Sequence, residues 1–361
     1  IPRKIDEGRI EDIRECIGCN ICISGDMTMS IARCTQNPTF MEDWRKGWHP
    51  EKIEPRGQSE NVLVVGAGPA GLEAARALGE RGYQVVLAEA ATGLGGRVAR
   101  ERKLPGLSAW GRVADYREYQ LSQMPNVDIY LDNELSADDV LEFGFEHAVL
   151  ATGSRWRADG VSRHHVVAVA NDGSLPVYTP DDLMDGKLPT GRVVLFDDDH
   201  YYMGGVCAEL LAEQGCEVML MTPSAHVSQW TSYTLEQPAI HARLVECGVE
   251  IVLNRALESI EQGRIKASCV YSGNVSVHEA DAVVMVASRV GNDALWQTLS
   301  ERETEWQANG IRSIKLIGDA ESPAPIAWAT YAGHRYAREL DGPDIGDALP
   351  FRREVTELKN D

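Results

Sequence analysis

The chain has 361 residues and a formal net charge of −20, which results from 35 basic and 55 acidic side chains. This surplus of negative charge argues against nucleic acid or an anionic membrane as a partner. No apolar run reaches the length of a transmembrane helix, and no targeting peptide is recognisable. We therefore expect a cytoplasmic protein of two or three domains.

Four cysteines lie close together near the start of the chain, at Cys16, Cys19, Cys22 and Cys34. Three thiolates at spacings of three residues can converge on one cluster, and a fourth can reach it from a more distant loop, which is how proteins hold a [4Fe–4S] cluster. Zinc sites usually use two separated cysteine pairs, and disulfide frameworks belong mostly to small secreted proteins. The spacing favours an iron–sulfur cluster, with zinc, a disulfide or no ligand at all as the alternatives.

From residue 61 onwards, short apolar strands alternate with helices, which is typical of an α/β fold with parallel sheets. A short helix is expected over 4–15, and the stretch 55–60 is expected to be a linker. Strands are predicted at 61–65, 84–89, 147–151, 192–196, 217–221, 249–253, 282–287 and 314–317. Helices are predicted at 69–81, 203–214, 236–247 and 325–339.

The strand at 61–65 leads into a glycine-rich turn and then into the helix at 69–81. In such a turn Gly66 makes the sharp bend, Gly68 lets the backbone approach a pyrophosphate, and Gly71 lets the helix pack on the strand. Glu89 follows the second strand at the distance where an acid accepts hydrogen bonds from a ribose. A turn that merely needs glycines is the alternative. The pattern predicts a site for ADP, or for the ADP half of FAD, at Gly66, Gly68, Pro69, Ala70, Gly71 and Glu89.

Three further segments favour a flavoprotein-type nucleotide site. Gly95, Gly96 and Arg97 follow the second strand, where another close backbone approach is useful; Arg97 could contact a phosphate or form a surface salt bridge. Thr152 and Gly153 end the strand at 147–151 in a turn of small residues. Gly318 and Asp319 end the strand at 314–317; Asp319 could bind a ribityl or ribose hydroxyl, or cap the following helix.

Together these motifs resemble the C-terminal half of the trimethylamine/dimethylamine dehydrogenase and 2,4-dienoyl-CoA reductase family of iron–sulfur flavoproteins. The resemblance extends over essentially the whole chain, and the segments 14–20, 47–51, 104–107 and 318–321 strengthen it. Full-length members begin with a TIM barrel that binds FMN and acts on the substrate. The resemblance implies that the barrel's FMN passes single electrons to the cluster, and that no catalytic residue or FMN contact can be assigned in this chain.

The resemblance also implies a fold class: glutathione-reductase-like FAD/NAD(P)-binding domains with parallel sheets, preceded by the cluster segment, with the family's N-terminal TIM barrel absent. The chain starts with Ile1, about where that barrel should end. The implied partners are the FMN-containing barrel portion, an electron-transferring flavoprotein and a second copy in a homodimer. We expect a cluster segment at 1–57, an ADP/FAD-binding domain at 58–187 plus 307–361, and an inserted NAD(P)-binding-like domain at 188–306.

The inserted domain opens with the strand at 192–196, but its next turn departs from a working NAD(P) loop. Asp199 and Tyr201 stand where two of the three glycines belong, and only Gly204 matches. A tyrosine fills the space that a pyrophosphate needs, and the three carboxylates at 197–199 repel its charge. We therefore expect this domain to keep its fold without binding NAD(P). By the resemblance, this favours the amine dehydrogenase branch, which carries ADP in place of FAD.

The sequence thus predicts the electron-transfer and nucleotide-binding portion of an oxidoreductase. We expect an amine dehydrogenase that passes electrons from FMN through [4Fe–4S] to an electron-transferring flavoprotein, with no substrate site in this segment. One alternative is an NADPH-dependent enoyl-CoA reductase-type flavoenzyme. The other is a structural or electron-transfer module that the bound nucleotide only stabilises.

Overall fold

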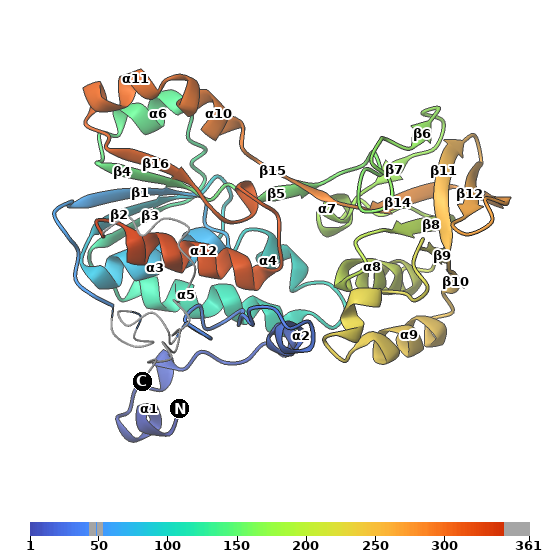
Figure 1. Cartoon of the computed structure of the whole chain (residues 1–361), viewed down its shortest axis with the longest axis horizontal. Coiled ribbons are helices and arrows are strands. Elements are labelled where there is room, and N and C mark those ends of the chain that lie inside the picture. Colours follow the sequence, from blue (N-terminus) through green and yellow to red (C-terminus); the bar gives the residue numbers. More distant parts are fainter. Residues whose placement is uncertain (43–47, 49–52, 343–361) are drawn as a thin grey trace, which may run out of the picture.

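The computed structural model describes residues 1–42, 48 and 53–342. They form two α/β domains side by side, and the cysteine segment (residues 14–37) runs along one side of both (Figure 1). The sequence segment at 47–51, apart from Trp48, and the stretch 343–361 of the predicted first domain lie outside the described residues.

The first domain is built on a five-stranded parallel sheet. Parallel strands need crossover connections, and helices cover both faces of this sheet (Figure 1). The strand order is β16 (Ser313–Leu316), β4 (His147–Leu150), β1 (Asn61–Val65), β2 (Gln84–Ala88) and β3 (Val127–Tyr130). One face carries α3 (Pro69–Arg81), α5 (Arg112–Ser122) and α12 (Ile326–Glu339), and the other carries α6 (Ala137–Glu142), α10 (Ala294–Glu301) and α11 (Glu303–Trp306).

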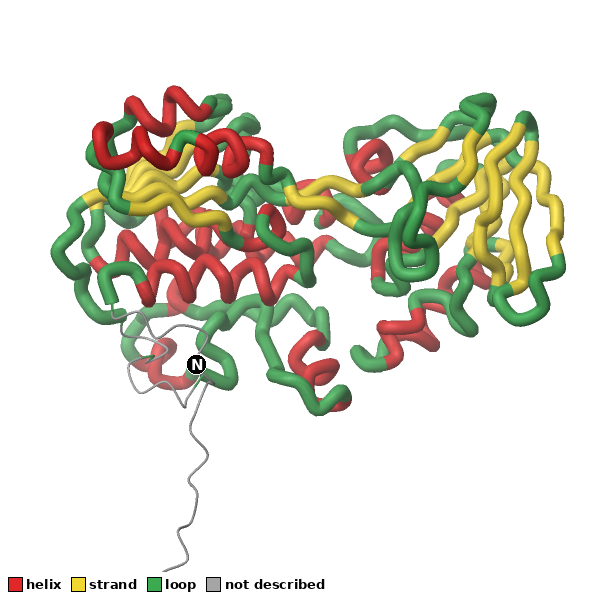
Figure 2. Tube along the Cα trace, turned by 45° about the horizontal axis from the view of Figure 1, so that its top comes forward, coloured by secondary structure: helices red, strands yellow, loops and turns green. Residues whose placement is uncertain are grey.

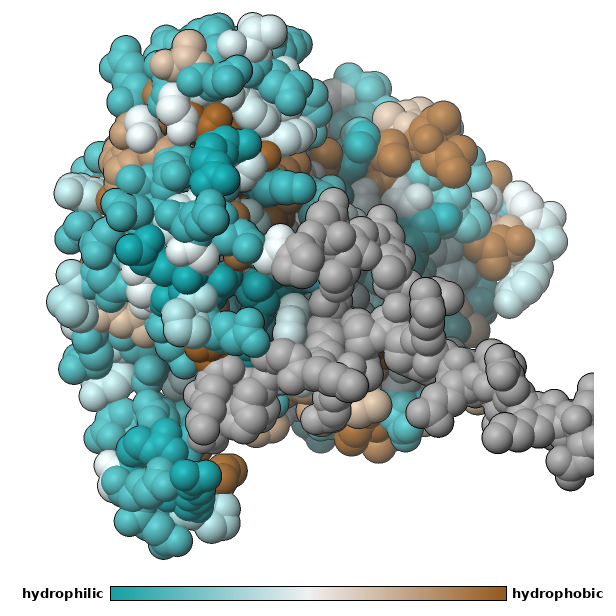
Figure 3. All heavy atoms as spheres, turned by 60° about the vertical axis from the view of Figure 1, so that its left-hand side comes forward, coloured by the Kyte–Doolittle hydropathy of each residue, from teal (hydrophilic) through white to brown (hydrophobic). Residues whose placement is uncertain are grey.

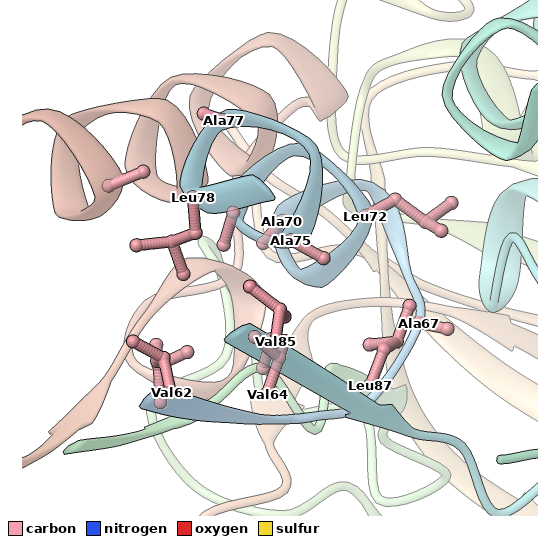
Figure 4. Packing of buried hydrophobic residues seen from close by; sticks show 14 of the residues in the cluster. Val62, Val64, Ala67, Ala70, Leu72, Ala75, Ala77, Leu78, Val85 and Leu87 are labelled. Carbon is pink, nitrogen blue, oxygen red and sulfur yellow. The ribbon is translucent and has the colours of Figure 1, made fainter. Parts of the chain in front are cut away.

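The core of the first domain lies between the sheet and α3. Val64 of β1 and Leu87 of β2 point toward α3, and Leu78 of α3 points toward the sheet (Figure 4); all three are fully buried members of one cluster. Burying one such side chain stabilises the fold by about 1.5–3 kcal/mol. Helix α12 in turn approaches α3 closely, because a Cβ at Gly333 would lie 2.1 Å from the carbonyl oxygen of Ala70.

The second domain contains two sheets. The parallel one has the order β10 (Glu250–Val252), β9 (Glu217–Met221), β8 (Arg192–Asp197), β14 (Ala282–Val286) and β7 (Val177–Tyr178). Helices α7 (Pro180–Met184), α8 (Tyr202–Glu213) and α9 (Gln237–Glu246) accompany it. The other sheet has the order β13 (Val275–Glu279), β12 (Arg264–Cys269), β11 (Arg255–Glu261) and β6 (Ala170–Asn171). Residues alternate along β8, so Leu195 faces the core around α8 and Phe196 packs with the second sheet.

A two-stranded antiparallel ribbon joins the domains, as Figure 2 shows. It pairs β5 (Ser154–Trp156) with β15 (Arg289–Gly291), so the chain leaves the first sheet near Trp156 and returns near Arg289. The predicted insert, 188–306, therefore begins after β5 has left the first domain and ends after β15 has returned to it. Both crossings lie close to the predicted nucleotide residues Thr152, Gly153 and Asp319.

The N-terminal region has little regular structure of its own. Helix α1 covers only Pro2–Asp6, and the cysteine segment contains the short helix α2 (Ile21–Met27). The prediction of one helix over 4–15 is wrong, because Gly8 takes a left-handed backbone (φ 71°) and interrupts it. The remaining short elements are α4 (Arg97–Glu101) and 3-10 turns at Ile10–Asp12, Ser108–Gly111, Gln229–Ser232, Gln307–Asn309 and Gly318–Ala320.

The outer face of the first domain is mostly hydrophilic, as the net charge leads one to expect (Figure 3). Among the residues that the structure describes, no helix combines the length and the apolar character needed to span a bilayer.

Candidate functional site: a glycine turn, an ion-pair cluster and a cysteine segment

The turn between β1 and α3 has the geometry of a phosphate-binding loop. Gly66 has φ 99°, and a Cβ there would lie 2.5 Å from the carbonyl oxygen of Ala151. A Cβ at Gly71 would lie 1.8 Å from the carbonyl oxygen of Gly66. By contrast, a Cβ at Gly68 would meet nothing within 4 Å. The backbone is thus compact at two glycines and open at the third, where the N-terminal N–H groups of the 13-residue helix α3 can bind an anion.

Glu89 is held directly against this turn. Its carboxylate accepts hydrogen bonds from the backbone N–H groups of Ala67 (2.6 Å) and Ala91 (2.8 Å). These bonds fix the side chain at the end of β2, beside the first turn. The structure therefore brings together the predicted phosphate loop and the predicted ribose-binding acid.

Other predicted segments converge on the same turn. The N–H of Gly95 donates to the carbonyl oxygen of Ala67 (2.9 Å), and a Cβ at Gly96 would lie 3.0 Å from the Cα of Gly68. On the opposite side, a Cβ at Gly318 would lie 2.7 Å from the Cβ of Ala70. Thr152 and Gly153 follow Ala151, which contacts Gly66, and the Thr152 hydroxyl donates to the carbonyl oxygen of Asn292 (2.5 Å).

Arg97 and Asp319 form an ion-pair cluster next to the turn. The Arg97 guanidinium pairs with Glu101 (Nε to Oε1, 2.9 Å) and with Asp319 (Nη2 to Oδ2, 3.1 Å). Asp319 also pairs with Arg289 and accepts a hydrogen bond from the N–H of Ala324 (3.1 Å). Burial lowers the pKa of Arg289. Although burial opposes its charged form, the Glu101 and Asp319 carboxylates raise the pKa of Arg97.

This cluster refines the predicted roles. Of the two roles considered for Arg97, the structure shows a salt bridge, but a buried one. Asp319 lies in the 3-10 turn before α12 and gives that helix no side-chain cap, since the N-cap is Pro325. Arg289 was missed because it lies 30 residues from Asp319, and nothing in its local sequence indicates the pairing.

The turn after β8 is filled by its own carboxylates. Asp197 is fully buried, and a Cβ at Gly204 would lie 2.5 Å from its Cγ. Asp197 Oδ1 accepts a hydrogen bond from the N–H of His200 (3.1 Å). Asp198 accepts a hydrogen bond from the N–H of His164 (2.8 Å) and also pairs with the His200 imidazole (3.0 Å). Burial raises the pKa of Asp197 to about 7. Tyr201 stands at the start of α8 with its ring against Tyr202 (4.6 Å).

The four predicted cluster ligands lie on the cysteine segment and form no disulfide. Cys22 is on α2, and the other three are in loops. Gly18 and Asn20, which flank Cys19, both take left-handed backbone (φ 72° and 51°) and so turn the chain sharply around it.

Polar groups already point at the sulfurs. The N–H of Gly18 lies 3.4 Å from Cys16 Sγ, and the N–H of Asn37 lies 3.4 Å from Cys34 Sγ. The Thr35 hydroxyl lies 3.1 Å from Cys19 Sγ. Burial raises the pKa of Cys19, which the Thr35 contact partly offsets. Such N–H and O–H contacts to sulfur are typical of iron–sulfur sites and tune their potentials.

The donor types therefore fit a [4Fe–4S] cluster, but the sulfurs are not gathered. Within the described residues, no group of three or more His, Cys, Asp or Glu side chains is arranged to hold a metal ion. Cluster binding would need the cysteine side chains to turn toward a common centre. The ligand role of Cys16, Cys19, Cys22 and Cys34 stays a prediction.

A cavity of about 750 Å³ lies where the two domains meet the cysteine segment. Cys19 of the segment, Arg97 of the first domain, Trp156 and Arg289 of the ribbon, and Tyr202 of the second domain all line it. Four buried polar atoms of lining residues lack a hydrogen-bond partner among the described residues: Arg97 Nε and Nη1, Glu101 Oε2 and Trp156 Nε1. Of these, Arg97 Nε has the ion pair with Glu101. Polar groups of this kind usually have water or a ligand as their partner.

Comparison with known proteins agrees with this two-domain organisation. Residues 64–126 match the model of an NAD(P)-binding Rossmann-like domain, and residues 178–294 match that of an OYE-like second alpha/beta domain. The fold and site thus define a two-domain α/β protein of the nucleotide-binding type.

Individual relatives give a more specific assignment. The chain is 41% identical to dimethylamine dehydrogenase of Hyphomicrobium sp. (strain x), covering 98% of this chain and 52% of that protein. The structure of histamine dehydrogenase from Rhizobium sp. 4-9 matches with a TM-score of 0.97 at 65% identity, covering 99% of this chain and 56% of that one. For 6-hydroxypseudooxynicotine amine oxidase from Pseudomonas geniculata N1, the TM-score is 0.90 at 46% identity, covering 93% of this chain and 50% of that one. The chain is thus similar to dimethylamine dehydrogenase and histamine dehydrogenase, and it spans about half their length.

These matches correct the predicted fold class. We expected glutathione-reductase-like nucleotide domains throughout, with the family's barrel absent. The second domain instead matches an OYE-like second alpha/beta domain, and its turn after β8 is occupied by protein carboxylates. The statement about the barrel is withdrawn, because the matches cover nearly all of this chain and give no evidence of a missing barrel.

Proposed function

We propose that this chain supplies the nucleotide-binding and electron-transfer functions of an amine dehydrogenase that contains a flavin and an iron–sulfur cluster. The observation that carries the proposal is the convergence of the glycine turn, Glu89 and Gly95–Gly96 on one open position at Gly68. The cysteine segment is bonded to the same domain through Gln36. The homology to dimethylamine and histamine dehydrogenases supports an amine as the substrate.

In this proposal the glycine turn binds ADP. The N–H groups at the start of α3 donate to its phosphates, and Gly68 leaves room for them. Glu89 accepts from the ribose hydroxyls, as its fixed position at the end of β2 allows. Asp319 is already paired with Arg97 and Arg289, so it is not free for a ribityl chain, which favours ADP over FAD.

The cysteine segment provides the electron-transfer site. Bound there, a [4Fe–4S] cluster would supply single-electron transfer between FMN and an outside acceptor. Cys16, Cys19, Cys22 and Cys34 would hold it, and the N–H groups of Gly18 and Asn37 would stabilise the thiolates. The proposed partners are an FMN-binding TIM-barrel portion as donor and an electron-transferring flavoprotein as acceptor. A homodimer and a reducing compartment such as the cytoplasm complete the proposal.

The second domain has a structural role in this scheme. Asp197 and Asp198 stand at the turn after β8. Asp197 accepts from the N–H of His200 in that turn, and Asp198 accepts from the N–H of His164 in another loop. A pyrophosphate would have to displace them and would then meet the negative charge of Asp198. We therefore propose that this domain does not bind NAD(P).

A flavin-containing reductase is the second candidate, and the cavity between the domains favours it. Arg97 lines that cavity and directly follows Gly96, which contacts the glycine turn. The cavity would give room to the flavin half of FAD, and its unpartnered polar atoms would give that half hydrogen-bond partners.

Analysis of the bound groups separates these candidates. The protein is purified without oxygen, and iron, sulfide, flavin and nucleotide are measured on one sample. The proposal predicts iron and sulfide in equal amounts together with ADP. FAD in place of ADP would support the reductase. A protein with neither nucleotide nor inorganic sulfide after anaerobic reconstitution would overturn both.

A further inference from the structure

We propose that Gln36 and Arg117 are positioning residues, which hold the two ends of the cysteine array at the separation that its metal centre requires. The inference rests on the proposed function of the cysteine segment. It concerns residues outside the cysteine motif, at a position where the sequence gives no signal.

Gln36 joins the flanks of the first and the last cysteine. It lies two residues after Cys34, and its side chain is buried. Its Nε2 donates to the carbonyl oxygen of Glu15 (3.0 Å), the residue before Cys16, and to the carbonyl oxygen of Arg112 (3.1 Å). One side-chain amide therefore ties both ends of the array to each other and to the start of α5.

Arg117 fixes the orientation of that amide. Its guanidinium is fully buried, and Nη1 donates to Gln36 Oε1 (3.1 Å) and to the carbonyl oxygen of Val113 (2.8 Å). Because Oε1 must face a group that only donates, Nε2 must face the two carbonyls. The network thus permits only one of the two amide orientations.

Arg117 is in turn anchored in the nucleotide domain. Its Nε donates to Glu73 Oε2 (2.8 Å), and Glu73 is a fully buried residue of α3. Glu73 also pairs with Arg76 (2.8 Å) and accepts from His334 of α12 (2.9 Å). Although burial opposes its charged form, Arg76 and Arg117 hold the pKa of Glu73 well below its usual range. A charged, buried network therefore runs from the helix of the glycine turn to Gln36, two residues after Cys34.

Few other contacts join the two ends of the array. Two further contacts act at its middle, where the Tyr202 hydroxyl donates to the carbonyl oxygen of Cys19 (3.2 Å) and the Asn20 amide donates to that of Thr234 (3.0 Å). The segment's own helix α2 has seven residues, and its small apolar cluster joins Ile17 to Val98, Val113 and Ile326. The bond from Arg112 Nη1 to the carbonyl oxygen of Cys16 (2.8 Å) is exposed, and exposed charged groups contribute little. A buried donor or acceptor that loses its partner costs more free energy than an exposed one, so the Gln36 bonds dominate.

The test compares two Gln→Leu variants that differ in burial. Gln36→Leu removes both donors and the acceptor at nearly constant volume. Gln120→Leu is the matched control, because Gln120 makes one exposed bond to the same region, to the carbonyl oxygen of Glu11 (3.3 Å). Both variants and the wild type are reconstituted with iron and sulfide. The release of iron to a chelator and the electron paramagnetic resonance spectrum of the reduced protein are then recorded.

We expect Gln36→Leu to release iron roughly 10- to 100-fold faster than the wild type, the range found when outer-shell partners of metal ligands are removed, and to show shifted g-values. Gln120→Leu should match the wild type, and ADP binding should be unchanged in both. Equal release rates and identical spectra for Gln36→Leu would overturn the inference. If the wild type takes up no iron and sulfide, the proposed cluster itself fails, and this inference fails with it.

A second variant keeps the test decisive if Gln36→Leu does not fold. Arg117→Lys retains a positive charge beside Glu73, but its compact ammonium cannot reproduce the fork that binds Glu73 and Gln36 together. It should bind ADP as the wild type does and release iron faster. A folded Arg117→Lys protein with wild-type iron release would also overturn the inference.

Discussion

The turns after β1 and β8 have the same architecture and opposite chemistry. Each joins a strand of a parallel sheet to a helix packed on that sheet. After β1, glycines bring backbone segments together and leave open space at Gly68. After β8, the Asp197 side chain accepts a hydrogen bond from the N–H of His200 in the turn, and the Asp198 side chain accepts one from the N–H of His164 in another loop.

The comparison separates the glycine that the fold needs from those that a ligand needs. Both turns keep a glycine near the start of the helix, Gly71 in one and Gly204 in the other, and a Cβ at either would collide with the turn. Only the first turn also has Gly66 and Gly68. The fold can therefore persist with one small residue, whereas the phosphate site depends on the other two.

The largest expected effect is at the shared glycine. Gly71→Ala and Gly204→Ala should each lower the free energy of unfolding by about 3 kcal/mol, because the added Cβ has no space. Denaturant unfolding measures the loss of stability, and titration with ADP shows whether nucleotide binding is weakened as well. Gly71→Ala should also weaken ADP binding, and Gly204→Ala should not. A Gly71→Ala protein as stable as the wild type would show that the backbone at Gly66 does not lie this close to Gly71.

Gly68→Val should block the ligand without harming the fold. Gly68 has an ordinary backbone (φ −73°, ψ −177°), which a valine accepts, and its Cβ would meet nothing in the protein. The side chain would project into the phosphate position, and ADP affinity should fall about 100-fold, or roughly 2.7 kcal/mol. Gly93→Val is the matched control, because Gly93 is equally open and lies off the turn. Unchanged ADP affinity in Gly68→Val would place the nucleotide elsewhere.

The buried Asp197 at the second turn should make the stability of the protein depend on pH. Burial raises the pKa of Asp197 to about 7, so between its unfolded pKa near 3.8 and pH 7 the folded protein binds a proton that the unfolded chain does not. Stability is then lost as the pH rises through 7. Between pH 5 and 7.5 the wild type should lose about 2 kcal/mol more than Asp197→Asn. Equal pH profiles in thermal unfolding would mean that Asp197 is ionised throughout.

The smallest effect is expected at Glu89. Glu89→Gln should weaken ADP binding about tenfold, because hydrogen bonds from the ribose hydroxyls to a neutral amide are weaker than those to a carboxylate. Calorimetry with 2′,3′-dideoxy-ADP supplies the check, since the difference between wild type and variant should disappear when the hydroxyls are missing. A difference that persists with the dideoxy nucleotide would mean that Glu89 only supports the turn through Ala67 and Ala91.

Local sequence was enough to predict both strand–turn–helix units. β1 and α3 begin and end as predicted, and β8, α8 and β9 agree to within a residue, because each is a strong apolar run bounded by glycine or polar residues. The convergence of Gly66, Glu89 and Gly95 on one place also followed from the motif. By contrast, the sheet formed by β6 and β11–β13 was not predicted, because its strands are partly exposed and have no continuous apolar run.

The long-range pairings could not be predicted from the sequence. Arg289 reaches Asp319 only because the ribbon returns beside the first sheet. Gln36 and Arg117 are 81 positions apart and carry no motif, yet they connect the cysteine array to α3. Residues of this kind become visible only when burial and partners are known, because their role depends on what surrounds them.

The number of nucleotides bound by one chain is the most direct test of the account. Equilibrium dialysis of the purified protein against ADP should give one site per chain, and Gly68→Val should abolish it. Two sites per chain, or a single site that survives Gly68→Val, would show that the turn after β8 or another surface binds the nucleotide, and the contrast between the two turns would then be wrong.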